Sequence, residues 1–321
     1  MKNVLKQFQV LHQDRHLIAV NKFPGILSLP DQSERLCVHD AVRQYIQKEY
    51  HLSNLPWLAP VHRLDIGSSG VLIFAKSSKA ASRLGRQFNH INTGSTPVEK
   101  RYLAVVRGSF SSSSGIFVHK LRKVMNTARP SRVKIIHRIT TNHRVAEQEE
   151  SENRTKDQLA SLSWKVIGEC RDFGQSLIEV LLHTGRRHQI RSQLAYEGLP
   201  IIGDQLYAPP HMHKSKSWLQ MEQKRSIALH SAFIRVLHPK SSEKLIITAR
   251  VPEIWRKVFG PQLEEMANVH ISLLASDCSR YKEGEAWWKA RTGRLLFWHD
   301  CQYCKEKKNQ QSFNYTRTTI N

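Results

Sequence analysis

The stretch that decides the fold is Val61-His-Arg-Leu-Asp65-Ile-Gly-Ser-Ser-Gly70, which leads directly into the apolar run Val71-Leu-Ile-Phe-Ala75. The apolar run predicts a short, buried strand. The loop before it places a carboxylate, a guanidinium and small hydroxyls beside glycines, which let the backbone approach a ligand closely. Two interpretations stay open here: a ligand-binding loop around Asp65, or an ordinary Asp/Ser turn with a surface pair between Arg63 and Asp65.

A second polar stretch, Leu182-His-Thr-Gly185-Arg-Arg-His-Gln-Ile-Arg191-Ser-Gln-Leu-Ala195, predicts a helix that starts near Arg187 and ends at Gly198. Arg186, Arg187 and Arg191 crowd the start of this helix, where the helix dipole is already positive. Such an arrangement is costly unless an anion lies there, either a buried carboxylate or an RNA phosphate. The alternative is that these arginines cap exposed loops.

Short strands alternate with a few helices around these two stretches. Strands are predicted at residues 17–21, 102–106, 163–167, 177–182, 228–237 and 245–251, and helices over 38–46 and 78–91. This order predicts an α+β fold. We expect a catalytic domain over residues 1–260 and a C-terminal extension of unknown role over residues 261–321.

The charge of the chain indicates its class of partner. The 321 residues carry 49 Lys and Arg against 27 Asp and Glu, a formal net charge of +22, which predicts attraction to a polyanion. The densest stretch, Gly115–Ala146, has eight Lys and Arg and no acid. No apolar run is long enough for a membrane span, and five cysteines without a signal-peptide pattern favour a cytoplasmic location.

Taken together, these motifs resemble the RluA-type pseudouridine synthases, which isomerise uridine in RNA. The resemblance covers roughly residues 8–252 and rests on His62-Arg-Leu-Asp65 with Ser-Ser-Gly70, Lys100-Arg-Tyr102-Leu-Ala-Val-Val-Arg-Gly108, Gly185-Arg-Arg-His-Gln-Ile-Arg191, Gly198-Leu-Pro-Ile-Ile-Gly-Asp204 and Leu229-His230. It implies a mixed, largely antiparallel sheet with an active-site cleft across it. It also implies that the enzyme needs neither a metal nor a cofactor.

The resemblance also implies a role for particular residues. Asp65 would be the catalytic carboxylate, Tyr102 would pack against the target ring, and Arg191 would pair with Asp65 and keep it ionised. Arg63 would insert toward the RNA and hold the flipped-out base. Further substrate contacts are expected from His62, Ser68, Arg186, His188 and Gln189. Whether Asp65 attacks the sugar, attacks the base or removes a proton stays open.

We therefore expect an isomerase that acts on ribosomal or transfer RNA, works as a monomer and needs no obligatory protein partner. One alternative is a non-catalytic RNA-binding protein that has kept the fold. Another is a hydrolase that uses Asp65 with His62 or His188 on a phosphate or glycosyl substrate.

Two regions depart from the family pattern or lie beyond it. Gln193 stands where the family usually has His, and we expect it to alter phosphate contacts or substrate choice. In the tail, Cys301-Gln-Tyr-Cys304 is one Cys pair, whereas a structural zinc site needs four ligands. We therefore expect reduced thiols and no metal. Recognition of the target RNA would come from the catalytic domain, from Gly115–Ala146 or from the tail.

Overall fold

The computed structural model describes residues 7–32, 35, 37–89, 98–124, 132–138, 157–170, 173–276 and 296–297. The strands are β1 (Phe8–Gln13), β2 (Leu17–Lys22), β3 (Ala59–Pro60), β4 (Ser69–Ala75), β5 (Glu99–Arg107), β6 (Ser114–Lys123), β7 (Val133–Arg138), β8 (Gln158–Cys170), β9 (Gln175–Leu182), β10 (Leu229–Leu237), β11 (Lys244–Thr248) and β12 (Leu296–Phe297). The helices are α1 (Val38–Glu49), α2 (Ser78–Phe88), α3 (Gln189–Tyr196), α4 (Lys216–Gln223), α5 (Glu253–Phe259), α6 (Pro261–Ser276) and the short 3₁₀ helix η2 (Pro210–Lys214).

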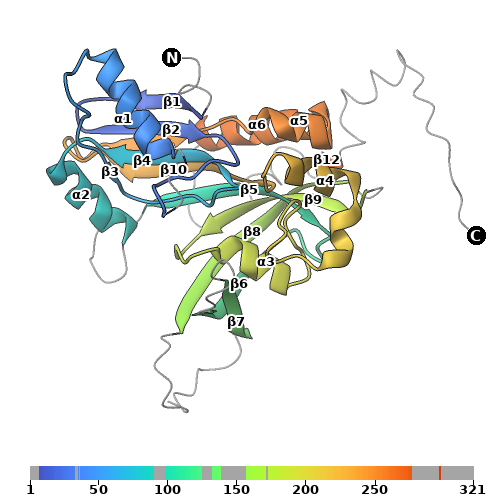
Figure 1. Cartoon of the computed structure of the whole chain (residues 1–321). Helices are drawn as coiled ribbons and strands as arrows, with labels where there is room; N and C mark the ends of the chain where they lie inside the picture. Colours follow the sequence, from blue (N-terminus) through green and yellow to red (C-terminus); the bar gives the residue numbers. More distant parts are fainter. Residues whose placement is uncertain are drawn as a thin grey trace, which may run out of the picture.

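The strands form one open sheet in the order β1-β2-β4-β10-β5-β9-β8-β6-β7, with β11 beside β10, β12 beside β8 and β3 beside β4 (Figure 1). The described strand pairs are antiparallel apart from β4 with β10 and β8 with β12, which are parallel. The predicted α+β fold with a mixed, largely antiparallel sheet is therefore confirmed. None of the helices in the described ranges has the length and apolarity to cross a membrane.

The central strands carry apolar runs, Leu17–Val20 in β2 and Val71–Ala75 in β4, because both faces of the sheet are covered there. Every residue of β2 and β4 is buried. Alternate residues point to opposite faces: Ile18 and Phe74 belong to the cluster that holds α1, whereas Leu17 and Ile73 belong to the cluster that holds α2. Helices α1 and α2 thus lie on opposite sides of this part of the sheet (Figure 1).

The structure differs from the predicted elements in the middle of the chain. The basic stretch Gly115–Ala146 holds the strand pair β6 and β7, whose inner side buries Leu121, Val133 and Ile135. Helix α3 begins at Gln189 rather than near Arg187. The predicted domain boundary at residue 260 stays a prediction, but α6, which comprises the first 16 residues of the expected extension, packs against the core of the sheet.

Gly70 is required where β4 meets β10. Its φ is +111°, and a Cβ atom at this position would lie 2.2 Å from the carbonyl oxygen of Ser231. That oxygen belongs to the backbone of the neighbouring strand and has no room to yield. Only glycine therefore allows the parallel pairing of Gly70 with Ser231.

We predict that Gly70→Ala lowers the free energy of unfolding by about 3 kcal/mol, measured by urea denaturation. Gly85→Ala is the matched control. Gly85 lies within α2 with no neighbouring atom within 4 Å of its virtual Cβ, so alanine there should stabilise the protein by about 0.5–1 kcal/mol. An unchanged stability of the Gly70→Ala variant would contradict this account of the β4–β10 junction.

Candidate active site

The loop that carries Asp65 is held by a short turn and by a buried lysine. The Ser68 side-chain hydroxyl and backbone N–H donate to the Asp65 carbonyl oxygen at 2.9 and 3.1 Å. The ammonium group of Lys22, which is fully buried, donates to the carbonyl oxygens of Phe23, Ile66 and Ser68 at 3.0, 3.2 and 2.7 Å. Ser68 and Lys22 therefore fix the backbone from which the Asp65 side chain extends.

Lys22 is a residue that the sequence analysis missed. Burial lowers its pKa to about 7, against the opposing effect of the Asp65 charge. In the sequence Lys22 follows Asn21 after the apolar run Leu17–Val20. This pattern is equally typical of a strand that ends in water. The structure instead buries the ammonium group under the Asp65 loop.

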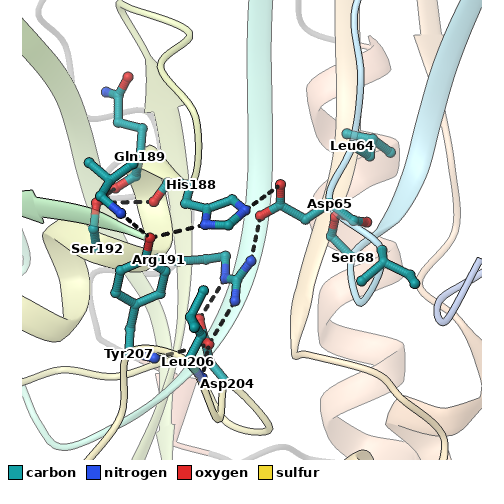
Figure 2. A network of polar contacts seen from close by, with 12 residues as sticks. Leu64, Asp65, Ser68, His188, Gln189, Arg191, Ser192, Asp204, Leu206 and Tyr207 are labelled. Carbon is teal, nitrogen blue, oxygen red and sulfur yellow. Dashed lines mark hydrogen bonds and ion pairs between the residues drawn. The ribbon is translucent and has the colours of Figure 1, made fainter. Parts of the chain in front are cut away.

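Asp65 meets Arg191 in a shared ion pair. The Arg191 Nη1 atom donates to Asp65 Oδ2 at 2.9 Å, while Nε and Nη2 donate to the two carboxylate oxygens of Asp204 at 2.7 and 2.9 Å (Figure 2). Asp204 is only 1% exposed. The pairing of Arg191 with Asp65 is thus present, and Asp204, which the sequence shows only as an acid in a turn, anchors the guanidinium in a bidentate contact.

The charges around Asp65 hold it ionised. Burial by itself raises the pKa of this carboxyl, but Arg191, His188 and Arg63 lower it, and the pKa ends below its usual range. At neutral pH Asp65 is therefore a carboxylate, the state that a nucleophile or a general base needs.

His188 approaches the other oxygen of Asp65, with Nε2 at 3.6 Å from Oδ1. Its Nδ1 lies 3.0 Å from the hydroxyl of Tyr207, a residue absent from the predicted site. The Tyr207 ring also lies beside Arg191, with the guanidinium carbon 5.2 Å from the ring centroid. Figure 2 shows His188, Arg191 and Tyr207 facing Asp65 from one side.

Tyr102 lies on β5 directly opposite Ser231 of β10. It is 7% exposed, and burial together with the nearby charge of Asp65 raises its pKa to about 12. The phenol therefore stays neutral beside the carboxylate. This placement is consistent with the expected role of an aromatic wall next to Asp65.

Three predicted substrate-binding residues make contacts within the protein, and their contact with substrate stays a prediction. His62 Nε2 accepts a hydrogen bond from the Ile73 N–H at 3.0 Å, and its ring stacks on Phe88 with centroids 4.6 Å apart. The Gln189 side chain joins loops by accepting from the Thr184 hydroxyl and the Arg186 N–H and by donating to the Ser161 carbonyl oxygen. The Arg186 Nε donates to the Leu159 carbonyl oxygen at 3.2 Å.

The remaining predicted positions divide by exposure. Arg63 is exposed and close enough to Asp65 to lower its pKa. Gln193 is fully buried, with its amide 2.8 Å from His119 Nδ1. Any influence of Gln193 on RNA is therefore indirect. The structure places five of the predicted residues close to Asp65, and their functional roles stay predictions: Arg63, Ser68, Tyr102, His188 and Arg191.

One group of side chains in the described ranges has the spacing of metal ligands. The ligand atoms of Cys37, His39 and Asp40 lie within 4.8 Å of one another. These groups already satisfy each other, since Cys37 Sγ lies 3.1 Å and His39 Nδ1 2.9 Å from the Asp40 carboxylate. Cys301 and Cys304 lie outside the described residues, and the expected absence of a metal stays a prediction.

Comparison with known proteins identifies similar chains. Residues 16–196 match the family model described as RNA pseudouridylate synthase. The chain is 28% identical over 259 residues to tRNA pseudouridine synthase C of Haemophilus ducreyi, covering 79% of this chain and 95% of that relative. It is 30% identical over 254 residues to tRNA pseudouridine synthase C of Salmonella typhi, covering 78% of this chain and 88% of that relative. The solved structure of human RNA pseudouridylate synthase domain containing 4 shares the fold, with a TM-score of 0.58 and 20% identity over 82% of this chain and 94% of that chain.

We predict that Arg191→Gln raises the pKa of Asp65, because it removes the guanidinium and leaves the Asp204 charge unpaired. The sign for stability follows from linkage. A carboxyl whose folded pKa lies below the unfolded value of 3.8 stabilises the fold above that value, and the gain is lost as the pH falls through the folded pKa. Arg191→Gln should therefore lose the stabilisation that the ionised Asp65 gives the fold above pH 3.8.

The pKa is measured by ¹³C NMR of aspartate labelled at the carboxyl carbon. Arg122→Gln, which breaks an exposed bidentate pair with Asp157, is the control and should leave the Asp65 titration in place. An Asp65 pKa that is the same in wild type and Arg191→Gln would show that Arg191 does not keep this carboxylate ionised.

Proposed function

The chain belongs to the RNA pseudouridylate synthase family, and on this premise we propose that it isomerises uridine to pseudouridine in transfer RNA with Asp65 as the catalytic carboxylate. The observation that carries the proposal is the Asp65 carboxylate held by Arg191, which Asp204 anchors in turn. The relatives named tRNA pseudouridine synthase C favour transfer RNA over ribosomal RNA. Action in the cytoplasm as a monomer is part of the proposal on the ground of the sequence alone.

The reaction makes specific demands on the site. It breaks the glycosidic carbon–nitrogen bond, rotates the uracil and rejoins it to the sugar through a ring carbon, which then gives up its hydrogen as a proton. Uridine and pseudouridine are isomers, and only a proton is exchanged with water. The reaction therefore needs no external oxidant or reductant. It does need an ionised carboxylate beside the sugar, as nucleophile or as base, and Asp65 supplies that charge.

The target base must also leave its stack, which costs a few kcal/mol. In this proposal Tyr102 offers the ring that receives the everted uracil, since it is neutral, buried and within the electrostatic reach of Asp65. Arg63 is exposed two residues before Asp65 in the same loop. It would enter the space that the base leaves and contact the neighbouring phosphates.

We propose that the RNA backbone binds at the end of the β6–β7 pair where Lys123 and Val133 are paired, which we call the base of this pair. Lys123 pairs in register with Val133, whose N–H donates to the Tyr207 hydroxyl at 3.0 Å. Arg132 precedes Val133 and, like Lys123, is exposed. These two cations therefore flank a residue that contacts the polar network around Asp65, where phosphates next to the target nucleotide would pass.

We predict that Asp65→Asn, which keeps the shape of the side chain, lowers pseudouridine formation at least about 1,000-fold and leaves the affinity for transfer RNA nearly unchanged. The measurement is the release of tritium from transfer RNA that carries uridine labelled at ring carbon 5. Asp157→Asn, at an exposed ion pair with Arg122, is the control. Turnover by Asp65→Asn at the wild-type rate would contradict the proposal, and a wild-type protein that binds RNA without turnover would favour the non-catalytic alternative.

We predict that the double variant Lys123→Ala/Arg132→Ala weakens binding of transfer RNA and lowers the slope of log K against log salt by roughly two, because each lost phosphate contact removes about one unit. The control is the double variant Lys240→Ala/Lys244→Ala, which also removes two positive charges. It removes two exposed cations near the end of β10 that is remote from Ser231, and its slope should equal that of wild type. Equal slopes for both double variants would exclude the base of the β6–β7 pair from the RNA interface.

A further inference from the structure

A chain of polar contacts runs from the start of β7 to the carboxylate of Asp65. The Val133 N–H donates to the Tyr207 hydroxyl oxygen at 3.0 Å, the same hydroxyl lies 3.0 Å from His188 Nδ1, and His188 Nε2 lies 3.6 Å from Asp65 Oδ1. The last two links are drawn in Figure 2. Val133, Tyr207 and His188, from three separate segments, thus form a line of contacts that ends at one oxygen of the carboxylate.

The first link fixes one direction, and the direction of the contact between Tyr207 and His188 depends on the tautomer of the imidazole. A backbone N–H can only donate, so the Tyr207 oxygen accepts from Val133. The hydroxyl has one hydrogen of its own, and within the described residues the other group at hydrogen-bond distance is His188 Nδ1. If the hydroxyl donates to Nδ1, that nitrogen carries no hydrogen. In a neutral imidazole the hydrogen then resides on Nε2, the atom that faces Asp65.

We propose that Tyr207 is a positioning residue that fixes the Nε2–H tautomer of His188, and that this N–H holds Asp65 Oδ1 while Arg191 holds Oδ2. The inference rests on the proposed function of Asp65 and deepens it. With a donor on each oxygen, the plane of the carboxylate is set as well as its charge. The 3.6 Å separation is longer than a formed hydrogen bond and would shorten when substrate fills the site, as active-site contacts do on binding.

The surroundings of His188 agree with a neutral donor. Burial lowers the pKa of His188 to about 4, with Asp65 and Asp204 opposing and Arg191 and Arg187 reinforcing the shift. The ring is therefore uncharged at neutral pH. A charged imidazolium would have two donating nitrogens and no place for a hydrogen bond from Tyr207.

The backbone of His188 is held in an unusual conformation. Its φ of +50° lies in the left-handed region, which costs a non-glycine residue about 1 kcal/mol or more. The Gln189 side chain ties this turn down through Thr184 and Arg186. This conformation directs the imidazole between Tyr207 and Asp65.

The first test reads the tautomer without any turnover. Nitrogen NMR of histidine labelled with ¹⁵N in the full-length protein distinguishes a ring nitrogen that bears hydrogen from one that does not. We expect hydrogen on His188 Nε2 in wild type and a mixture of tautomers in Tyr207→Phe. Hydrogen on Nδ1 in wild type, or the same tautomer in both proteins, would overturn the inference, whether or not the protein acts on transfer RNA.

The second test reads the effect on the reaction. Tyr207→Phe keeps the ring beside Arg191 and should lower the single-turnover rate about 3- to 10-fold, the worth of one hydrogen bond, while the dissociation constant for transfer RNA stays the same. Tyr50→Phe removes a hydroxyl that accepts a hydrogen bond from Gln13 and is the matched control. An unchanged rate in Tyr207→Phe would overturn the role of the His188 N–H at Asp65.

A double-mutant cycle separates this role from a general loss of packing. The amide of glutamine at position 188 has its own N–H donor, whose direction does not depend on the tautomer. We therefore expect Tyr207→Phe to have little further effect when it is added to His188→Gln. Rate losses that add fully in the double variant would show that Tyr207 and His188 act independently and would overturn the inference. A wild-type protein that does not turn over transfer RNA would overturn the proposed function instead, and the NMR test of the tautomer would still apply.

Discussion

The site depends on one guanidinium shared between two carboxylates. Arg191 contacts Asp204, 13 residues further along the chain, through two hydrogen bonds and Asp65, 126 residues away in sequence, through a third. Taking a carboxylate out of water raises its pKa, and the cation reverses that effect for Asp65. The bidentate contact with Asp204 keeps the planar guanidinium from turning away, so Asp65 meets a fixed charge.

The sheet brings these groups together through the way its strands are connected. The loop after β3 carries Asp65, and β4 then lies parallel to β10, where Gly70 allows close contact with Ser231. Strand β5 follows β10 in the sheet and places Tyr102 opposite Ser231. Lys22 at the end of β2 completes the arrangement by binding the carbonyl oxygens of the Asp65 loop. The Asp65 carboxylate, the Tyr102 ring and the Lys22 ammonium group therefore come from strands or loops that the central sheet fixes relative to one another.

The family resemblance implied the pairing of Arg191 with Asp65, which joins residues far apart in the sequence. Much of the fold could be predicted from the residues themselves, because apolar runs and clustered charges are local signals. The uninterrupted apolar runs of β2 and β4 and the arginines before α3 are examples. Asp204, Lys22 and Tyr207 could not be predicted, since a single polar residue in a turn or at a strand end looks the same whether its partner is water or a distant side chain. Strands β6 and β7 were missed because their exposed face is so basic that the few buried residues, such as Leu121 and Ile135, leave a weak alternation.

The most direct measurement is a crystal structure of the protein bound to a transfer RNA stem-loop that carries its target uridine. The account predicts an everted nucleoside whose sugar lies about 3 Å from an Asp65 carboxylate oxygen, with Arg191 still bridging Asp65 and Asp204. A nucleoside bound elsewhere, or an Arg191 that leaves Asp65 to bind a phosphate, would contradict it.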